Sequence, residues 1–227
     1  MVQVVRTLLF YVDDIYASHK EQNVLDDLLK VINDKFKTDT QDLSITRGTN
    51  HDYIGMNIDF SGKDHVRITQ YNFLEDILDK TSRHFGGMNG TSVTPAVSDV
   101  FTVDETSTSL SKQQAEYFHR ITARLLFASK RARPDLQVAV AYLCTRVKSP
   151  TVSDYIKLVR VIKYIRATIH LPLLLGWDKT GTLTWAVDAS SAVHRDFRSP
   201  TGALLTLGKG AAMAFSMKQK DQLQDFH

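Results

Sequence analysis

The sequence predicts an α+β protein, and three observations predict this class. Runs of β-branched and aromatic residues open the chain. Short alternating segments recur near residues 54–68 and again after residue 183. Between them, residues 111–170 carry apolar side chains at helical spacing. The composition, 43% hydrophobic and 23% charged, is typical of a globular protein and excludes a disordered or collagen-like chain.

A β-hairpin is predicted at the start of the chain. Val2–Val12 and Ile15–Ser18 are rich in the residues that strands favour. Asp13 and Asp14 stand between these runs and are expected to form the turn, because Asp favours turns.

A helix is expected after this hairpin. Ser18 and Glu21 have the spacing of a capping box, so the helix should run from there to about Lys37. Its apolar stripe has helical spacing and is expected to belong to the core: Val24, Leu25, Leu28, Leu29, Ile32 and Phe36.

Two or three short strands are expected next. Residues 54–60 alternate, residues 61–64 predict a turn, and residues 66–68 return. A helix is expected from about Gln70 to Lys80. The Gly-, Ser- and Thr-rich residues 81–111 then predict a long linker. The inward side chains of this helix should be Phe73, Leu74, Ile77 and Leu78.

Three helices are expected in the middle of the chain. Ser111 and Gln114 form a capping box that begins the first, Pro134 opens the second, and the third begins near Pro150. The C-terminal part predicts a three-stranded antiparallel meander from its alternating pattern and its glycine turn. The expected strands are residues 183–188, 202–207 and 211–217.

Charge is distributed unevenly. Residues 1–110 carry 10 Lys/Arg against 17 Asp/Glu (−7), residues 111–170 carry 12 against 3 (+9), and residues 171–227 carry 6 against 5 (+1). A local excess of this size can attract nucleic acid, although a solvated helical surface is an equally good interpretation. The residues expected to bind nucleic acid are Arg131, Arg133, Lys157, Arg160, Lys163 and Arg166.

Several classes of protein are excluded. No apolar run is long enough to span a membrane, and no signal peptide is apparent, so an intracellular location is expected. The single Cys144 precludes an internal disulfide and a thiolate zinc site.

The adjacent Asp13 and Asp14 are the main candidate site. Two neighbouring carboxylates in an apolar hairpin repel each other, and a divalent cation such as Mg²⁺ would relieve that repulsion. A polymerase needs carboxylates of this kind to hold two metal ions. A plain turn is the alternative.

The flanking residues carry a resemblance. LLFYVDDI resembles the Tyr-x-Asp-Asp hairpin of reverse transcriptases, and later segments occur in the order found in copia-type LTR retrotransposon polyproteins. These segments are Tyr53-Ile54-Gly55, Ile68-Thr69-Gln70-Tyr71, Thr94-Pro95, Arg133-Pro134-Asp135-Leu136, Ala139-Val140, Val187-Asp188-Ala189-Ser190, 198–202 and 216–219.

The resemblance implies an architecture. Residues 1–85 would be the C-terminal part of a reverse-transcriptase palm with its primer-grip hairpin. Residues 86–175 would be a linker and a basic helical thumb or connection, and residues 176–227 would begin an RNase H-like fold. The location would be a cytoplasmic virus-like particle or the nucleus.

The resemblance also implies roles. Asp13 and Asp14 would be catalytic, metal-binding carboxylates, and Asp188 would be a ligand of the RNase H metal pair, with an ordinary strand-end Asp as the alternative. Tyr11, Val12, Tyr53 and Gly55 would contact the primer or nucleotide. The cofactor would be Mg²⁺ or Mn²⁺, and the partners would be an RNA/DNA template–primer and the remainder of the polyprotein.

The sequence departs from this family pattern at both ends. Only twelve residues precede Asp13, and none is acidic, whereas the family takes another Asp from an upstream strand. The family also has a Glu soon after the stretch at 216–219, where this chain offers only Asp221 and Asp225. We therefore expect a polyprotein fragment that is inactive alone. A non-catalytic nucleic-acid-binding module and an unstable relic are the alternatives.

Overall fold

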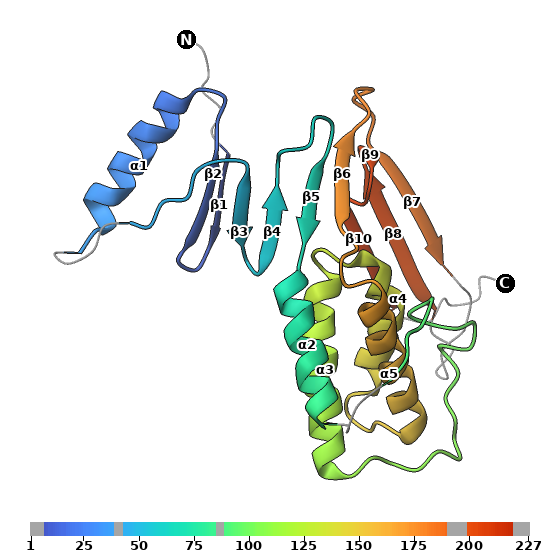
Figure 1. The fold of residues 1–227 in the computed structure, drawn as a ribbon. Helices are drawn as coiled ribbons and strands as arrows, with labels where there is room; N and C mark the ends of the chain where they lie inside the picture. The colour runs from blue at the N-terminus through green and yellow to red at the C-terminus, as the bar shows by residue number, and fades with distance from the viewer. Residues whose placement is uncertain (1–6, 39–42, 85–88, 190–198, 220–227) are drawn as a thin grey trace.

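The strands of the chain form three separate antiparallel sheets beside a helical body (Figure 1). The computed structural model describes residues 7–38, 43–84, 89–189 and 199–219. Strands and helices segregate along the chain instead of alternating, which makes the arrangement α+β. Within these ranges no helix is both long and apolar enough to cross a membrane.

The first sheet is a hairpin of β1 (Thr7–Tyr11) and β2 (Asp14–Ser18). Tyr11 pairs with Asp14, so Val12 and Asp13 form the turn. The turn is therefore one residue earlier than the Asp13-Asp14 turn that the sequence predicted. Residues 2–6 of the predicted strand lie outside the described ranges.

Helix α1 (Gln22–Phe36) corrects two predictions. Its N-cap is Glu21, which makes no side-chain capping bond, while Ser18 is the last residue of β2. The predicted capping box is absent because the strand extends through Ser18. None of the residues of α1 is buried, and the side chain of Phe36 is 69% exposed. The apolar stripe is amphipathic as predicted, but it is not part of the core.

The second sheet joins distant parts of the chain. The predicted strands at 54–60 and 66–68 correspond to β4 (Met56–Asp59) and β5 (Val66–Thr69), but Ile54 lies in the turn before β4, and β3 (Asn50–Tyr53), which was not predicted, pairs with β4. Strand β6 (Leu173–Trp177), which the alternation pattern did not predict, pairs with β5, and β9 (Gly208–Lys209) pairs with β6. The predicted domain boundary at 175/176 thus falls within β6.

Four helices bury the main core: α2 (Tyr71–His84), α3 (Lys112–Ser129), α4 (Gln137–Arg146) and α5 (Val152–Ala167). The capping box of Ser111 and Gln114 is confirmed at the start of α3, and Pro134 opens a 3-10 turn, Pro134–Leu136, that leads into α4. Among the described residues, the hydrophobic side chains with the least exposure are Ile77, Phe118, Leu125, Ala128, Leu136, Val140 and Ile165.

The third sheet is the predicted C-terminal meander. It consists of β7 (Thr184–Ala189), β8 (Pro200–Thr206) and β10 (Met213–Lys218), with β8 in the centre. The side chain of Gln137 on α4 donates a hydrogen bond of 2.9 Å to the carbonyl oxygen of Ala214, which attaches this sheet to the helical body.

Candidate nucleic-acid interface

The tip of the β1–β2 hairpin is strained and exposed. Val12 has a φ of 55° and a side chain that is 90% exposed. A β-branched residue rarely adopts this left-handed conformation, which costs on the order of 1–3 kcal/mol and often accompanies function. Asp13 and Asp14 follow directly, and both are exposed to solvent. The hairpin therefore presents two carboxylates outward.

The Asp pair has the donor chemistry of a magnesium site but lacks its full ligand set. Carboxylate oxygens suit Mg²⁺, which demands near-octahedral coordination. Across the described residues, no three His, Cys, Asp or Glu side chains are grouped so that they could hold a metal ion. Within the part of the chain that the structure describes, Asp13 and Asp14 therefore have no third candidate ligand beside them. These residues alone do not fit the metal pair of a polymerase.

The β3–β4 turn lies beside this hairpin. The ring of Tyr16 on β2 is 5.9 Å from that of Tyr53, stacks on Phe60 at 6.2 Å, and meets His51 edge-on at 5.8 Å. These contacts hold the two hairpins together, and Figure 1 shows their turns pointing in the same direction. The turn itself is Ile54-Gly55, and both residues have positive φ values. The expected primer-contact residues thus come from two adjacent turns.

The C-terminal end of α3 completes this region. A Cβ on Gly55 would lie 3.8 Å from Cε1 of Phe127, so the turn packs against that ring. The guanidinium of Arg131 stacks over the same ring at 3.5 Å from its centroid. Burial lowers the pKa of Arg131, and an electrostatic interaction with Tyr11 acts in the opposite direction. Arg131 therefore lies at the end of α3, stacked on the same ring that the second turn packs against.

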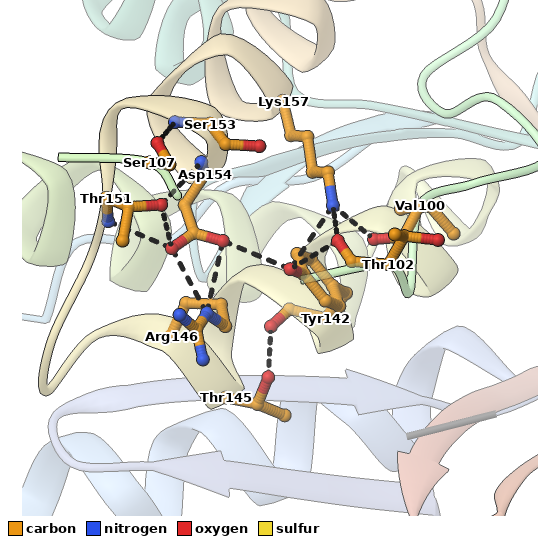
Figure 2. A network of polar contacts seen from close by, with 10 residues as sticks. All are labelled: Val100, Thr102, Ser107, Tyr142, Thr145, Arg146, Thr151, Ser153, Asp154 and Lys157. Atoms are coloured by element: carbon orange, nitrogen blue, oxygen red, sulfur yellow. Dashed lines mark hydrogen bonds and ion pairs between the residues drawn. The ribbon is translucent and has the colours of Figure 1, made fainter. Parts of the chain in front are cut away.

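The basic row of α5 is engaged with the linker. Nζ of Lys157 donates to the carbonyl oxygens of Val100 (2.9 Å) and Thr102 (2.5 Å) and lies 4.3 Å from the centroid of the Tyr142 ring (Figure 2). Burial lowers the pKa of Lys157. Arg160 donates to Oγ1 of Thr94 at 3.0 Å.

The rest of this row faces the same linker. Arg166 donates to the carbonyl oxygen of Gly90 at 3.4 Å, and Nζ of Lys163 lies near Gly90. The row predicted to contact phosphates thus fastens residues 90–102 to α5. The role predicted for these residues in nucleic-acid binding stays a prediction.

Arg133 is also structural. Its side chain is 1% exposed and makes an ion pair with Asp135 at 2.7 Å. Its two terminal nitrogens donate to Oγ1 of Thr168 (2.7 Å) and to the Thr168 carbonyl oxygen (3.2 Å). Arg133 therefore joins the start of α4 to the end of α5. Its predicted role in nucleic-acid binding stays a prediction, and these internal bonds compete with such a role.

A basic groove lies between α2 and α3, and the sequence reasoning missed it. Its volume is about 450 Å³. Its lining residues are Lys80, Arg83, Tyr117, Arg120, Ile121 and Arg124. Arg120 and Arg124 stand four residues apart, so they share one helix face. The spacing of Arg120 and Arg124 could have indicated a basic face on α3. It could not have indicated the groove, because the groove also needs α2 to pack beside that face.

Asp188 lies apart from the hairpins. It is exposed on β7, opposite Gly202, and its Oδ1 accepts a hydrogen bond of 2.9 Å from the backbone of Ala189. In Figure 1, β7 and the β1–β2 hairpin are on opposite sides of the five-stranded sheet. The alternative acids Asp221 and Asp225 lie outside the described residues. Within the described ranges Asp188 belongs to no group of three His, Cys, Asp or Glu side chains that could hold a metal ion.

The fold and the site together define an α+β chain in which an acidic hairpin lies beside a basic helical body. No protein-family model matches the chain, and no solved structure matches it. The chain is similar to a Saccharomyces cerevisiae (strain ATCC 204508 / S288c) protein described as "Putative transposon Ty5-1 protein", with 28% identity over 102 residues. This alignment covers 45% of the chain and 33% of the relative, so it spans a third of that protein's length. The similarity relates the chain to a retrotransposon protein.

Proposed function

We propose that this chain is part of a copia-type retrotransposon RNA-directed DNA polymerase with its RNase H, and that it holds an RNA/DNA template–primer. One observation carries the proposal: the hairpin bearing Tyr11 to Asp14 contacts Tyr53 through Tyr16, and the Tyr53–Gly55 turn packs against Phe127, on whose ring Arg131 stacks. The order of the family-like segments along the chain and the similarity to the yeast Ty5-1 protein support the same assignment.

The chemistry of this meeting point suits a nucleic-acid strand. A guanidinium stacked on a ring offers positive charge to phosphate and a flat face to a base. The exposed ring of Tyr11 and the side chain of Val12 lie at the hairpin tip, where a primer end could pack against them. Phosphate contacts of this kind are independent of sequence and weaken with salt.

We propose further that the chain binds without catalysis on its own. Polymerisation by two metal ions needs carboxylates that hold both ions, and Asp13 and Asp14 have no third partner among the described residues. Cleavage of an RNA–DNA hybrid also needs several carboxylates, and among the described residues Asp188 is not part of a group that could hold a metal ion. A retained binding module without enzymatic activity is therefore favoured over an active enzyme for this chain alone.

Two assays on the purified chain test the proposal. We expect a labelled RNA/DNA template–primer to bind at low salt and to dissociate as salt rises, while primer extension with Mg²⁺ or Mn²⁺ stays at background. The variant Asp13→Asn should bind at least as tightly, because it removes negative charge near the primer. Absence of binding at low salt would overturn the proposed binding. Primer extension that Asp13→Asn abolishes would overturn the proposed lack of catalysis.

A further inference from the structure

Residues 89–98, which we call the strap, cover part of the basic row of α5 without supplying a negative charge. The strap contains no Asp or Glu. Arg160 donates to Oγ1 of Thr94 at 3.0 Å, and Arg166 donates to the carbonyl oxygen of Gly90 at 3.4 Å. Two guanidinium groups thus meet neutral acceptors in the strap.

Arg160 uses only one half of a guanidinium edge. Its Nη2 bonds to Thr94, whereas its Nε, on the same edge, is buried and has no hydrogen-bond partner among the described residues. A buried donor without a partner is costly and rare. Two oxygens of a phosphate match such an edge, because the guanidinium presents its N–H groups as a planar fork. The unfilled donor of Arg160 therefore lies beside a threonine hydroxyl.

The sequence around this hydroxyl suits a class of modifying enzyme. Thr94 precedes Pro95, and a hydroxyl residue directly before proline is what proline-directed protein kinases recognise. The chain has two other dipeptides of this kind, Ser149-Pro150 and Ser199-Pro200. Pro150 and Ser199 are buried, whereas Thr94 is exposed and Pro95 is partly exposed. Thr94-Pro95 is therefore the one of the three in which neither residue is buried.

We propose that Thr94 is a phosphorylation site for a proline-directed protein kinase, and that the phosphothreonine clamps the strap to α5 through Arg160. The γ-phosphoryl of ATP is transferred: an O–P bond forms at Oγ1, the bond from the γ-phosphorus to the oxygen of ADP breaks, and the hydroxyl proton passes to the carboxylate base of the kinase. The product carries a charge of about −1.5 to −2 and three acceptor oxygens. This inference is independent of nucleic-acid binding.

The present contacts of the strap are weak enough to allow this reaction. Oγ1 of Thr94 donates to the carbonyl oxygen of Ala96 at 2.8 Å, and the backbone N–H of Ser92 donates to that of Lys163 at 3.4 Å, which is a long bond. A segment held in this way opens locally while the body stays folded. After transfer the bond to Ala96 is lost, because the ester oxygen has no proton. Charge-assisted bonds to Arg160, roughly twice as strong as neutral ones, replace it.

The first measurement locates the phosphate. The chain is incubated with a proline-directed kinase, ATP and Mg²⁺, and mass spectrometry identifies the modified residues. We expect Thr94 to be modified about tenfold faster than Ser149 or Ser199, because each of the other two dipeptides must first expose a buried residue. Thr94→Val should remove this phosphate. A synthetic peptide of residues 89–100 is the control for kinase activity. Absence of phosphate from Thr94 in the folded chain overturns the proposal, whether or not the peptide is modified.

The second measurement tests the clamp. Hydrogen exchange of the strap amides should be about fivefold slower in the phosphorylated chain than in the unmodified chain. Arg160→Gln should abolish this slowing, whereas Arg67→Gln, which removes an exposed arginine of β5, should retain it. Equal exchange in the two forms of the wild-type chain, or slowing that persists in Arg160→Gln, overturns the proposal.

A phosphorus NMR titration provides a readout that a merely structural role of Arg160 would not move. The second pKa of a phosphothreonine is about 6, and a guanidinium contact should lower it because it favours the dianion. We expect the lowered pKa in the wild-type chain and the ordinary pKa in Arg160→Gln. The same pKa in both chains overturns the contact. Thermal melting of each variant checks that the fold is retained.

Discussion

Nε of Arg146 at the end of α4 donates hydrogen bonds of 3.1 Å to both carboxylate oxygens of Asp154 on α5. The same carboxylate accepts from the backbone of Thr151 at 2.9 Å, where it closes the capping box of α5, and from the hydroxyl of Tyr142 at 3.1 Å (Figure 2). A single buried side chain, 2% exposed, thus fixes the end of one helix and the start of the next.

Replacing this carboxylate should destabilise the fold. Asp154→Ala leaves the Arg146 charge without its partner and removes a helix cap, so we expect the free energy of unfolding to fall by about 3 kcal/mol. Denaturant titration measures the change. The control, Asp79→Ala, breaks only the exposed pair with Arg83 and should cost less than about 1 kcal/mol. Equal losses in the two variants would contradict the structural role of Asp154.

Arg133 should tolerate no conservative replacement. Its planar group satisfies Asp135 and Thr168 at the same time, and a lysine ammonium cannot reproduce that fork. We expect Arg133→Lys to lower the free energy of unfolding by about 2 kcal/mol or more. The binding constant K for an RNA/DNA template–primer should show the wild-type slope of log K against log salt concentration. This slope is measured at a temperature where the variant is folded. A reduced slope would instead show that Arg133 contacts a phosphate of the nucleic acid.

The linker should loosen when Lys157 is changed. Lys157→Met removes the donor that holds the carbonyl oxygens of Val100 and Thr102 against α5. We expect a Glu-specific protease to cut after Glu105 several-fold faster than in the wild-type chain, because local opening exposes the backbone. Lys148→Met, at an exposed position, is the matched control and should leave the cutting rate unchanged. Identical rates in all three chains would show that Lys157 does not restrain the linker.

The sequence predicted the helical body well because that part obeys local rules. The capping box of Ser111 and Gln114 follows from the spacing of residues at the start of α3, and the structure confirms it. The buried positions Leu74 and Ile77 follow in the same way from the spacing within α2, and both are confirmed. It failed at α1, where the same spacing predicted a core that the described residues do not supply. Amphipathic periodicity shows that a face is apolar, but it cannot show what covers that face.

The candidate site could be predicted only in part. The motifs predicted Asp13, Asp14, Tyr53 and Gly55 as site residues, and the Tyr16–Tyr53 contact places their two hairpins next to each other; their roles stay predictions. The charge spacing on α5 could not reveal that residues 90–102 cross that face, and the role of its basic residues in nucleic-acid binding stays a prediction. The α2–α3 groove combines residues some forty positions apart, and no local pattern carries such a pairing.

The ion pair of Asp64 and Lys209 should make stability pH-dependent at low pH. The hydrogen bond from Lys209, followed by that from His65, lowers the pKa of Asp64 to about 2. A folded-state pKa below the unfolded value means that the stabilisation is complete above pH 4 and disappears as pH falls through 2. We expect the unfolding free-energy difference between wild type and Asp64→Asn to be constant above pH 5 and to approach zero near pH 2. A difference that grows on acidification would contradict this sign.

The joint between β6 and β9 should depend on the absence of a side chain at Gly210. Gly210 and Gly181 have nearly the same φ, 71° and 72°, so alanine should impose the same backbone strain of about 1 kcal/mol at both. Their surroundings differ. A Cβ at Gly181 meets nothing within 4 Å, whereas a Cβ at Gly210 would overlap the backbone oxygen of Leu174 on β6.

Because β6 is hydrogen-bonded to β5 on its other side, its backbone cannot move away without breaking that pairing. We therefore expect Gly210→Ala to lower the free energy of unfolding by about 3 kcal/mol and Gly181→Ala by about 1 kcal/mol. Denaturant titration of both variants measures the difference. Similar losses of unfolding free energy in the two variants would mean that the backbone near Gly210 moves to accept the added Cβ. The pairing of β9 with β6 would then not hold the C-terminal strands rigidly to the five-stranded sheet.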